Sequence, residues 1–288
     1  MNLTVTVLAL GAAACLGFAL VLTQMGLQQV SPLRGACISV PCSALAYLAL
    51  APFLLDVSAI TLRGATIFAF CGCLFPAAVT LLTFEANRRV GPAITGAFGN
   101  LTPLIAALLA VILLGEIPGL GVLTGMAVIL AGVLLIMGAQ RTIPQRAFGG
   151  AIGLLLLGAF IRGLVQPLVK TGLTDWPNPF AASLIAYVMS AGVILMAGFM
   201  REGRAVLHPP AASLPLFIPV GLLNGVSVLL IYAALERGSV AVVASLVACY
   251  PLATLVLSRS LLGAGGLNRR TVAGVIVTVL GVAVLLRG

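Results

Sequence analysis

Long runs of apolar residues, separated by short polar loops, repeat along the whole chain. Each run approaches or exceeds the ~20 residues that a helix needs to cross a hydrocarbon core of about 30 Å. The runs do not alternate between apolar and polar residues, as the strands of a membrane barrel do. We therefore expect ten membrane-spanning helices and no soluble domain. The expected spans are residues 3–24, 31–55, 62–84, 92–114, 118–139, 148–171, 179–200, 212–235, 239–262 and 271–287.

The second half of the chain repeats features of the first half at a fixed distance. Pro103 and Pro251 lie 148 residues apart, and so do Gly115 and Gly263. Proline and glycine are both unfavourable inside a helix, so their paired recurrence indicates a duplicated unit. We place the first repeat at residues 1–140, a linker at 141–147 and the second repeat at 148–288.

Each expected repeat contains five spans, which is an odd number. After five crossings the chain is on the opposite side of the membrane, so the second repeat is inserted upside down. Inverted repeats are typical of transporters, because two like units can exchange conformations and open a site to either side. The sequence thus predicts an all-α integral membrane protein of two inverted five-helix repeats. The alternative is that duplication only enlarged a helix bundle.

Composition supports the membrane assignment and narrows the partners. The chain is 61% hydrophobic and 7% charged, whereas soluble domains carry roughly 25% charged residues. The net charge of +9 is spread over short loops, so we expect contact with membrane lipid and no binding of nucleic acid.

The placement of Lys and Arg predicts the orientation of the chain. Loops on one side carry nine Arg residues, and the side of the termini carries four basic residues. Because cytoplasmic loops are enriched in Lys and Arg, we expect both termini to lie outside the cytoplasm. The nine are Arg34, Arg88, Arg89, Arg141, Arg146, Arg201, Arg204, Arg269 and Arg270, and the four are Arg63, Lys170, Arg237 and Arg287.

Signatures of catalysis are hard to find in the chain. The only histidine, His208, lies in a loop, and no carboxylate lies in the middle of a span. Cys71 and Cys73 point away from each other on a helix, which does not suit a metal pair. We expect no enzyme activity, no metal and no cofactor. An intramembrane enzyme using Arg162 or His208 is the alternative of another class.

Two polar residues lie deep in the sixth span. A cation at the depth of Arg162 is expensive, so it lines a wet cavity, pairs with another group or extends to the interface. Gln166 follows one turn later on the same face. We expect both residues to contact substrate.

The paired prolines also have polar neighbours. Asn100 lies three residues before Pro103, and Tyr250 directly precedes Pro251. A proline frees a backbone carbonyl, which together with Asn or Tyr suits an amino or carboxylate group. We expect Asn100 and Tyr250 to bind substrate and the two prolines to act as conformational hinges. The alternative is a packing kink whose free groups are satisfied by neighbouring helices.

A mixed aromatic and polar wall is expected from the third and eighth spans. Pro76, Thr80 and Phe84 share one helix face, and Asn224 and Tyr232 lie 148 residues after Pro76 and Phe84. Core packing alone could explain Phe84, but the amide of Asn224 needs hydrogen-bond partners. The complete set of expected substrate-binding residues is Thr80, Phe84, Asn100, Arg162, Gln166, Asn224, Tyr232 and Tyr250.

Several short patterns resemble the EamA repeat of the drug/metabolite transporter superfamily. The first half has an entry at Gly91-Pro92-Ala93, a proline at Pro103, a Leu-Gly-Glu ending at Glu116, and a last helix with Gly125 and Gly132. The second half repeats the pattern at Ala234, Gly238, Pro251, Gly263, Gly274 and Gly281, and Gly163 and Lys170 resemble the family's Gly…Lys pattern.

The resemblance implies a ten-helix carrier, and length and pattern look most like the YddG-type bacterial amino-acid exporters. It implies export of aromatic and other neutral amino acids through a central cavity. Ala264 departs from the pattern where Glu116 stands in the first repeat, and Arg162 stands where an aromatic residue is usual.

We therefore expect a monomeric amino-acid exporter of broad specificity that works by alternating access. The nearest alternative is a carrier of organophosphates, nucleotide sugars or drugs.

Overall fold

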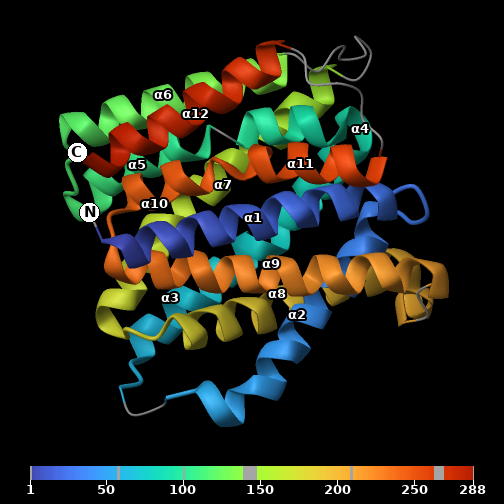
Figure 1. Cartoon of the computed structure of the whole chain (residues 1–288). Coiled ribbons are helices and arrows are strands. Elements are labelled where there is room, and N and C mark those ends of the chain that lie inside the picture. The colour runs from blue at the N-terminus through green and yellow to red at the C-terminus, as the bar shows by residue number, and fades with distance from the viewer. Residues whose placement is uncertain are drawn as a thin grey trace.

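The computed structural model describes residues 2–56, 59–99, 101–138, 148–207, 210–262 and 269–287. Within these ranges the chain forms helices and turns and no strand. The helices lie alongside one another, and both termini lie at the same end of the bundle, here called the terminal face (Figure 1). They are α1 (Leu3–Gly26), α2 (Pro32–Leu54), α3 (Leu62–Gly72), η1 (Cys73–Ala78), α4 (Val79–Gly99), α5 (Thr102–Leu114), α6 (Leu120–Gly138), α7 (Phe148–Asp175), α8 (Pro179–Glu202), η3 (Gly203–Leu207), η4 (Ala211–Ser213), α9 (Leu214–Arg237), α10 (Val240–Val247), α11 (Tyr250–Leu262) and α12 (Arg269–Arg287).

The helices confirm the expected ten-span, all-α architecture. Eight helical segments in the described ranges are long and apolar enough to cross a membrane, and Thr102–Leu114 and Leu120–Leu135 are shorter apolar helices. The largest difference from the expected boundaries lies between the third and fourth spans. The helical backbone of α4 continues from the third expected span into the fourth, and the interruption comes at Leu101 instead.

Equivalent residues start the second helix of each repeat. The Ser31 hydroxyl accepts a hydrogen bond from the Arg34 amide at 3.3 Å, and the Asn178 side chain accepts one from the Ala181 amide at 2.9 Å. Each cap is followed by a proline at the first helical position, where a missing N–H does no harm. Local sequence therefore fixes these two helix starts.

Helix packing follows the symmetry expected of inverted repeats. α1 of the first repeat packs along α9, and its counterpart α7 packs along α3 and α4. Likewise, α1 packs on α10 and α11, while α7 packs on α4 and α5. The pairs α2 with α8 and α6 with α12 join equivalent helices of the two repeats. The repeats are thus interleaved, and the centre of the molecule is built from both.

Both repeats contain a helix break at the same position. α4 ends at Gly99 and α10 ends at Val247, 148 residues later. α5 begins at Thr102 and α11 begins at Tyr250, at the same separation. Each break lies in the span that the sequence marked by its proline.

The prolines at these breaks do not kink a continuous helix. Pro103 is the second residue of α5, and Pro251 is the second residue of α11. In the first turn of a helix the N–H has no intrahelical partner, so proline is tolerated there. The expectation of an interrupted helix is confirmed. In each repeat a break separates two helices, α4 from α5 and α10 from α11.

The third span has a break of its own. Within η1, Phe75 has an extended backbone with φ −139° and ψ 122°, next to Pro76. Its counterpart in the second repeat, α9, is helical from Leu214 to Arg237. The two repeats therefore differ at this point.

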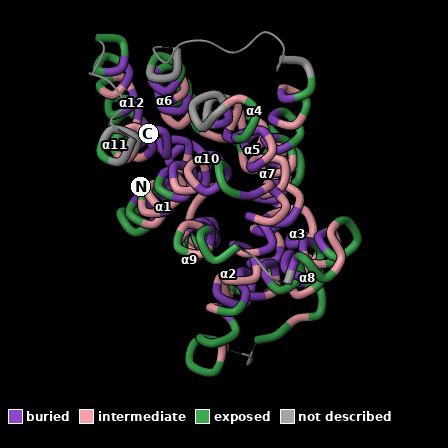
Figure 2. The backbone as a smooth tube through the Cα atoms, turned by 90° about the vertical axis from the view of Figure 1, so that its right-hand side faces the viewer, coloured by how far each residue is buried: buried purple, intermediate pink, exposed green. Residues whose placement is uncertain are grey.

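Side-chain size separates the lipid-facing surface from the interior. On α5, Leu104, Leu108 and Ile112 are exposed at intervals of four residues, while Ala106 and Ala110 are buried. Figure 2 shows the same division across the molecule, with buried residues gathered inside the ring of helices. An apolar outer surface of this kind suits lipid, and small inward residues let helices approach closely.

Glycines bring α6 and α12 into backbone contact. A β-carbon on Gly132 would lie 2.5 Å from the backbone nitrogen of Thr278, and one on Gly281 would lie 2.6 Å from that of Ile129. Gly125 faces Leu285 at similar range. Any larger residue at these positions would push the helices apart. We call this contact the glycine seam.

Candidate functional site

A central cavity lies between helices of both repeats. It contains about 950 Å³ of space, including its opening, and is lined by α1, α2, η1, α4, α7, α8, α9 and α11. Its α1 residues come from the C-terminal half of that helix, for example Leu20, and its α7 residues from the N-terminal half, for example Leu154. The cavity therefore occupies the half of the molecule away from the terminal face. We call it the larger cavity.

Arg162 is the charged residue at the inner end of this cavity. Its Nη2 donates a hydrogen bond to the Thr83 hydroxyl at 3.3 Å, and its guanidinium carbon lies 5.7 Å from the centre of the Phe75 ring. The Nε atom is buried and has no hydrogen-bond partner among the described residues. The Nη2 atom is thus held in place, and the Nε atom keeps an unused hydrogen-bond donor.

The charge of Arg162 has no acidic counterpart in the cavity. The described lining residues include hydroxyl, aromatic and aliphatic side chains but no Asp or Glu. An uncompensated cation at membrane depth is costly and generally marks a functional site. The arrangement can attract an anionic group and bind it through a charge-assisted hydrogen bond.

A second, smaller cavity continues from the first beyond Arg162. It contains about 530 Å³ of space, including its opening, and is lined by α1, η1, α4, α5, α7, α9, α10 and α11. The two cavities share Leu16, Phe75, Gly99, Arg162 and Tyr250. These shared residues mark the boundary between the cavities.

A polar cluster at the terminal face joins the two repeats. Lys170 of α7 forms an ion pair with Glu116, which follows α5. The Lys170 ammonium also donates to the Gly238 carbonyl at 2.7 Å, and Glu116 accepts a hydrogen bond from the Val240 amide at 2.9 Å. We call this group the terminal-face clamp. It fastens α7 and the start of α10 to the end of α5.

The sequence pattern of the EamA-like transporter family matches residues 3–138 and again residues 149–287. Together the two matches cover nearly all of the chain. This chain belongs to the EamA-like transporter family. It is accordingly a multi-pass membrane protein, and its family points to transport of small molecules.

Comparison with solved structures supports the fold and carries no information on the substrate. A solved structure titled "Crystal structure of protein" is similar to this EamA-like transporter with a TM-score of 0.78 and 17% identity. The similarity covers 99% of this chain and 96% of the other. A search of curated proteins found no match.

Most of the residues expected from the sequence border one of the two cavities. Those lining the larger cavity are Thr80, Phe84, Arg162, Asn224 and Tyr250, and those lining the smaller cavity are Arg162, Gln166, Tyr232, Tyr250 and Pro103. Asn100 lies outside the described residues. Pro251 is not among the described lining residues, although it adjoins Tyr250.

Several lining residues were not anticipated. Phe75 and Thr83 hold the Arg162 guanidinium, and Thr102 lines the smaller cavity at the start of α5. The position of Phe75 directly before Pro76 is a signal that was available, because a proline in a span marks a break where side chains can turn inward. Thr83 and Thr102 carried no comparable signal.

Helical spacing also brings two ion pairs together on the surface of α4 (Val79–Gly99). Glu85 forms ion pairs with Arg88 at 2.9 Å and with Arg89 at 2.6 Å. These residues are three and four positions apart on α4, the spacing at which side chains on a helix meet. Glu85 is therefore engaged with its helix neighbours and does not line either cavity in the described structure.

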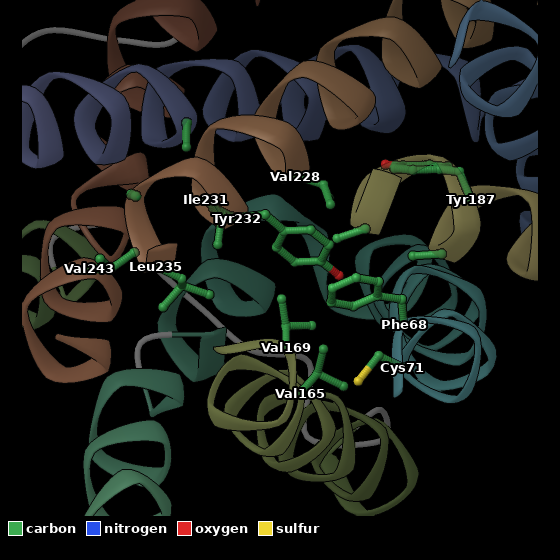
Figure 3. Close-up of a cluster of buried hydrophobic side chains, with 14 of the residues drawn as sticks. Phe68, Cys71, Val165, Val169, Tyr187, Val228, Ile231, Tyr232, Leu235 and Val243 are labelled. Carbon is green, nitrogen blue, oxygen red and sulfur yellow. The ribbon is translucent and has the colours of Figure 1, made fainter. Parts of the chain in front are cut away.

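The Tyr232 side chain is buried, and its hydroxyl is not exposed towards a substrate. Its side chain is 1% exposed, and in Figure 3 the hydroxyl points towards the cluster that contains Phe68 and Cys71. The oxygen has no hydrogen-bond partner among the residues that the structure describes. The tyrosine thus borders the smaller cavity while its hydroxyl is buried among apolar side chains.

Tyr232→Phe is expected to leave transport within about twofold of the wild type and not to lower thermal stability. Removing a buried hydroxyl that lacks a partner also removes its desolvation penalty of about 1–3 kcal/mol. Uptake into proteoliposomes and a melting curve in detergent measure the two effects. Tyr232→Ala is the comparison, because loss of the ring leaves a void and should lower the melting temperature. A Phe variant that folds but does not transport would place the hydroxyl on the substrate.

Proposed function

We propose that this EamA-like transporter exports aromatic and other neutral amino acids across the bacterial inner membrane. The observation that carries the proposal is Arg162, a cation whose Nε has no partner and whose described neighbours in the cavity lining are all uncharged. One fixed cation suits a ligand with one carboxylate. The hydroxyl and aromatic lining around it suits side chains of varied size and polarity.

The lining argues against the other substrate classes. An organophosphate or a nucleotide sugar carries two or more negative charges and needs several cations, but Arg162 is the one basic residue in the described lining. Lys170 is already engaged by Glu116. A cationic drug would be repelled by Arg162 and would find no carboxylate among the described lining residues.

The inverted repeats and the unequal ends of the cavity support alternating access. The clamp of Lys170 and Glu116 closes the terminal face, and the larger cavity lies towards the other face. With the termini outside the cytoplasm, as the Lys and Arg distribution predicts, the larger cavity faces the cytoplasm. This is the side from which an exporter loads its substrate.

The remaining roles complete the proposal. Thr80, Phe84 and Asn224 contact the substrate side chain in the larger cavity, and Asn100, which lies outside the described residues, also binds substrate. Pro103 and Pro251 act as hinges at the two breaks. Each repeat, residues 1–140 and 148–288, moves largely as a unit within a monomer.

Uptake into proteoliposomes tests the substrate class. Purified protein would be reconstituted, and uptake of labelled Phe, Trp, Met and Thr compared with that of a sugar phosphate and a quaternary cation, with empty liposomes as the control. We expect uptake of the amino acids, with competition among them. Uptake of only the phosphate or only the cation would overturn the amino-acid assignment.

A further inference from the structure

We propose that the smaller cavity binds the zwitterionic head group of the substrate, while the side chain of the substrate occupies the larger cavity. The inference rests on the proposed function, since it assumes that amino acids are carried. It adds a requirement that a single cation does not impose. The substrate must carry an ammonium group next to its carboxylate.

Helix ends of both polarities meet at the smaller cavity. Its lining includes Thr102 and Tyr250, the first residues of α5 and α11, and Gly99 and Val247, the last residues of α4 and α10. The residue before α5, Leu101, supplies no side-chain cap. Helix starts carry partial positive charge and helix ends carry partial negative charge. The two breaks thus offer both signs within one cavity, as the discontinuous helices of many transporters do.

Buried side chains add unpartnered hydrogen-bonding atoms to the same cavity. Gln166 is 7% exposed and Thr102 is 5% exposed, and neither the Gln166 Oε1 nor the Thr102 hydroxyl has a partner among the described residues. The Arg162 Nε is the third such atom. Buried polar atoms are normally paired, so these three unpaired atoms, apart from the Tyr232 hydroxyl that is buried among apolar side chains, indicate a site built for a polar ligand.

The three atoms divide between the two charges of an amino acid. The Arg162 guanidinium and the Thr102 hydroxyl are donors and suit the carboxylate. The Gln166 Oε1 is an acceptor and suits the ammonium, which has three donors to satisfy. Arg162 and Gln166 are four residues apart on α7, so their side chains are neighbours on one helix face. This spacing suits an α-amino acid, in which the ammonium and the carboxylate are attached to the same carbon.

The division between cavities explains how broad specificity and a strict head-group requirement coexist. Groups in the smaller cavity hold the part that all α-amino acids share. The larger cavity, bordered by Thr80, Phe84 and Asn224, receives the part that differs. Changes in the side chain of the substrate should therefore alter transport less than removal of its ammonium or its carboxylate.

Competition with head-group analogues tests the proposal in the wild-type protein. Uptake of labelled phenylalanine into proteoliposomes would be inhibited with phenylalanine, 3-phenylpropionate, which lacks the amine, and phenylalanine amide, which lacks the carboxylate. We expect each analogue to inhibit at least about tenfold more weakly, as loss of one charged contact implies. Equal inhibition by 3-phenylpropionate and phenylalanine would overturn the inference.

Two matched substitutions test which cavity recognises the ammonium group of the substrate. Gln166→Leu should weaken phenylalanine uptake and bring the inhibition by phenylalanine and 3-phenylpropionate to within about threefold, because the ammonium loses its acceptor. Asn224→Leu makes a similar change in the larger cavity and should leave the preference over 3-phenylpropionate at about tenfold or more. If Asn224→Leu loses the preference for phenylalanine over 3-phenylpropionate as Gln166→Leu does, the assignment of the ammonium to the smaller cavity is wrong.

A third variant, Thr102→Val, and the uptake measured with the wild-type protein complete the test. If Gln166→Leu does not fold, Thr102→Val replaces it, removes one hydroxyl at constant shape and should selectively lower the advantage of phenylalanine over its amide. If the wild-type protein takes up no amino acid, the proposed function fails. If it takes up amino acids without distinguishing the analogues, only this inference fails.

Discussion

Arg162→Met should lower kcat/KM for neutral amino acids by about 10- to 100-fold. A hydrogen bond to a charged group is worth about 1.5–3 kcal/mol, and each 1.4 kcal/mol is a factor of ten. The Met side chain keeps much of the length of Arg but cannot bind the carboxylate. Initial rates of uptake into proteoliposomes over a range of substrate concentrations measure the change.

The same substitution should not destabilise the protein. Because the Arg162 Nε has no partner in the described structure and the charge is not balanced by a neighbouring carboxylate, the folded state carries a cost that Met removes. We expect an equal or higher melting temperature in detergent together with the loss of transport. Arg201→Met, at the exposed end of α8, is the matched control and should change neither property. Wild-type uptake by a folded Arg162→Met variant would remove Arg162 from the binding site.

Glu116→Gln is expected to open the terminal face. The substitution breaks the ion pair with Lys170 and weakens the cap on the Val240 amide, a combined loss of about 1–2 kcal/mol. Such a change shifts the ratio of closed to open molecules by a factor of about 5–30. A cysteine at Ala244, which lines the smaller cavity, reports the opening when the six native cysteines are replaced.

The measurement is the rate at which an impermeant maleimide labels that cysteine from the terminal side. We expect labelling to rise about 5- to 30-fold with Glu116→Gln, in line with the shift in population. Glu202→Gln, which breaks the ion pair with Arg34 near the other face, is the matched control and should not raise labelling from the terminal side. Unchanged labelling in Glu116→Gln, or an equal rise in Glu202→Gln, would show that the clamp does not hold the terminal face closed.

Much of the fold could be read from the sequence because membrane spans have a length and an apolar pattern of their own. The 148-residue repeat predicted the helix breaks, since proline and glycine restrict the backbone in ways that do not depend on distant contacts. The end of α5 at Gly115, which has a left-handed backbone with φ 68°, follows from the same property. Features set by local backbone chemistry were therefore predictable.

The partners of the site residues were harder to predict. Arg162 stood out because a cation in a span is rare, but Thr83 lies 79 residues away in sequence and resembles any other threonine. Lys170 and Glu116 each looked like residues at the end of a span, and their pairing appears only when α5 and α7 are packed together. The direction of the Tyr232 hydroxyl depends on side-chain packing in the same way. Pairings of this kind require the tertiary arrangement of both repeats.

The glycine seam between α6 and α12 has a consequence for the proposed motion. These helices are equivalent members of the two repeats, and their backbones touch at Gly132 and Gly281. Sliding one helix along the other by a residue would drive side chains into backbone atoms, so the seam resists shear. It can serve as a fulcrum about which the repeats tilt, with little relative displacement at the seam and the largest at the far side of the molecule.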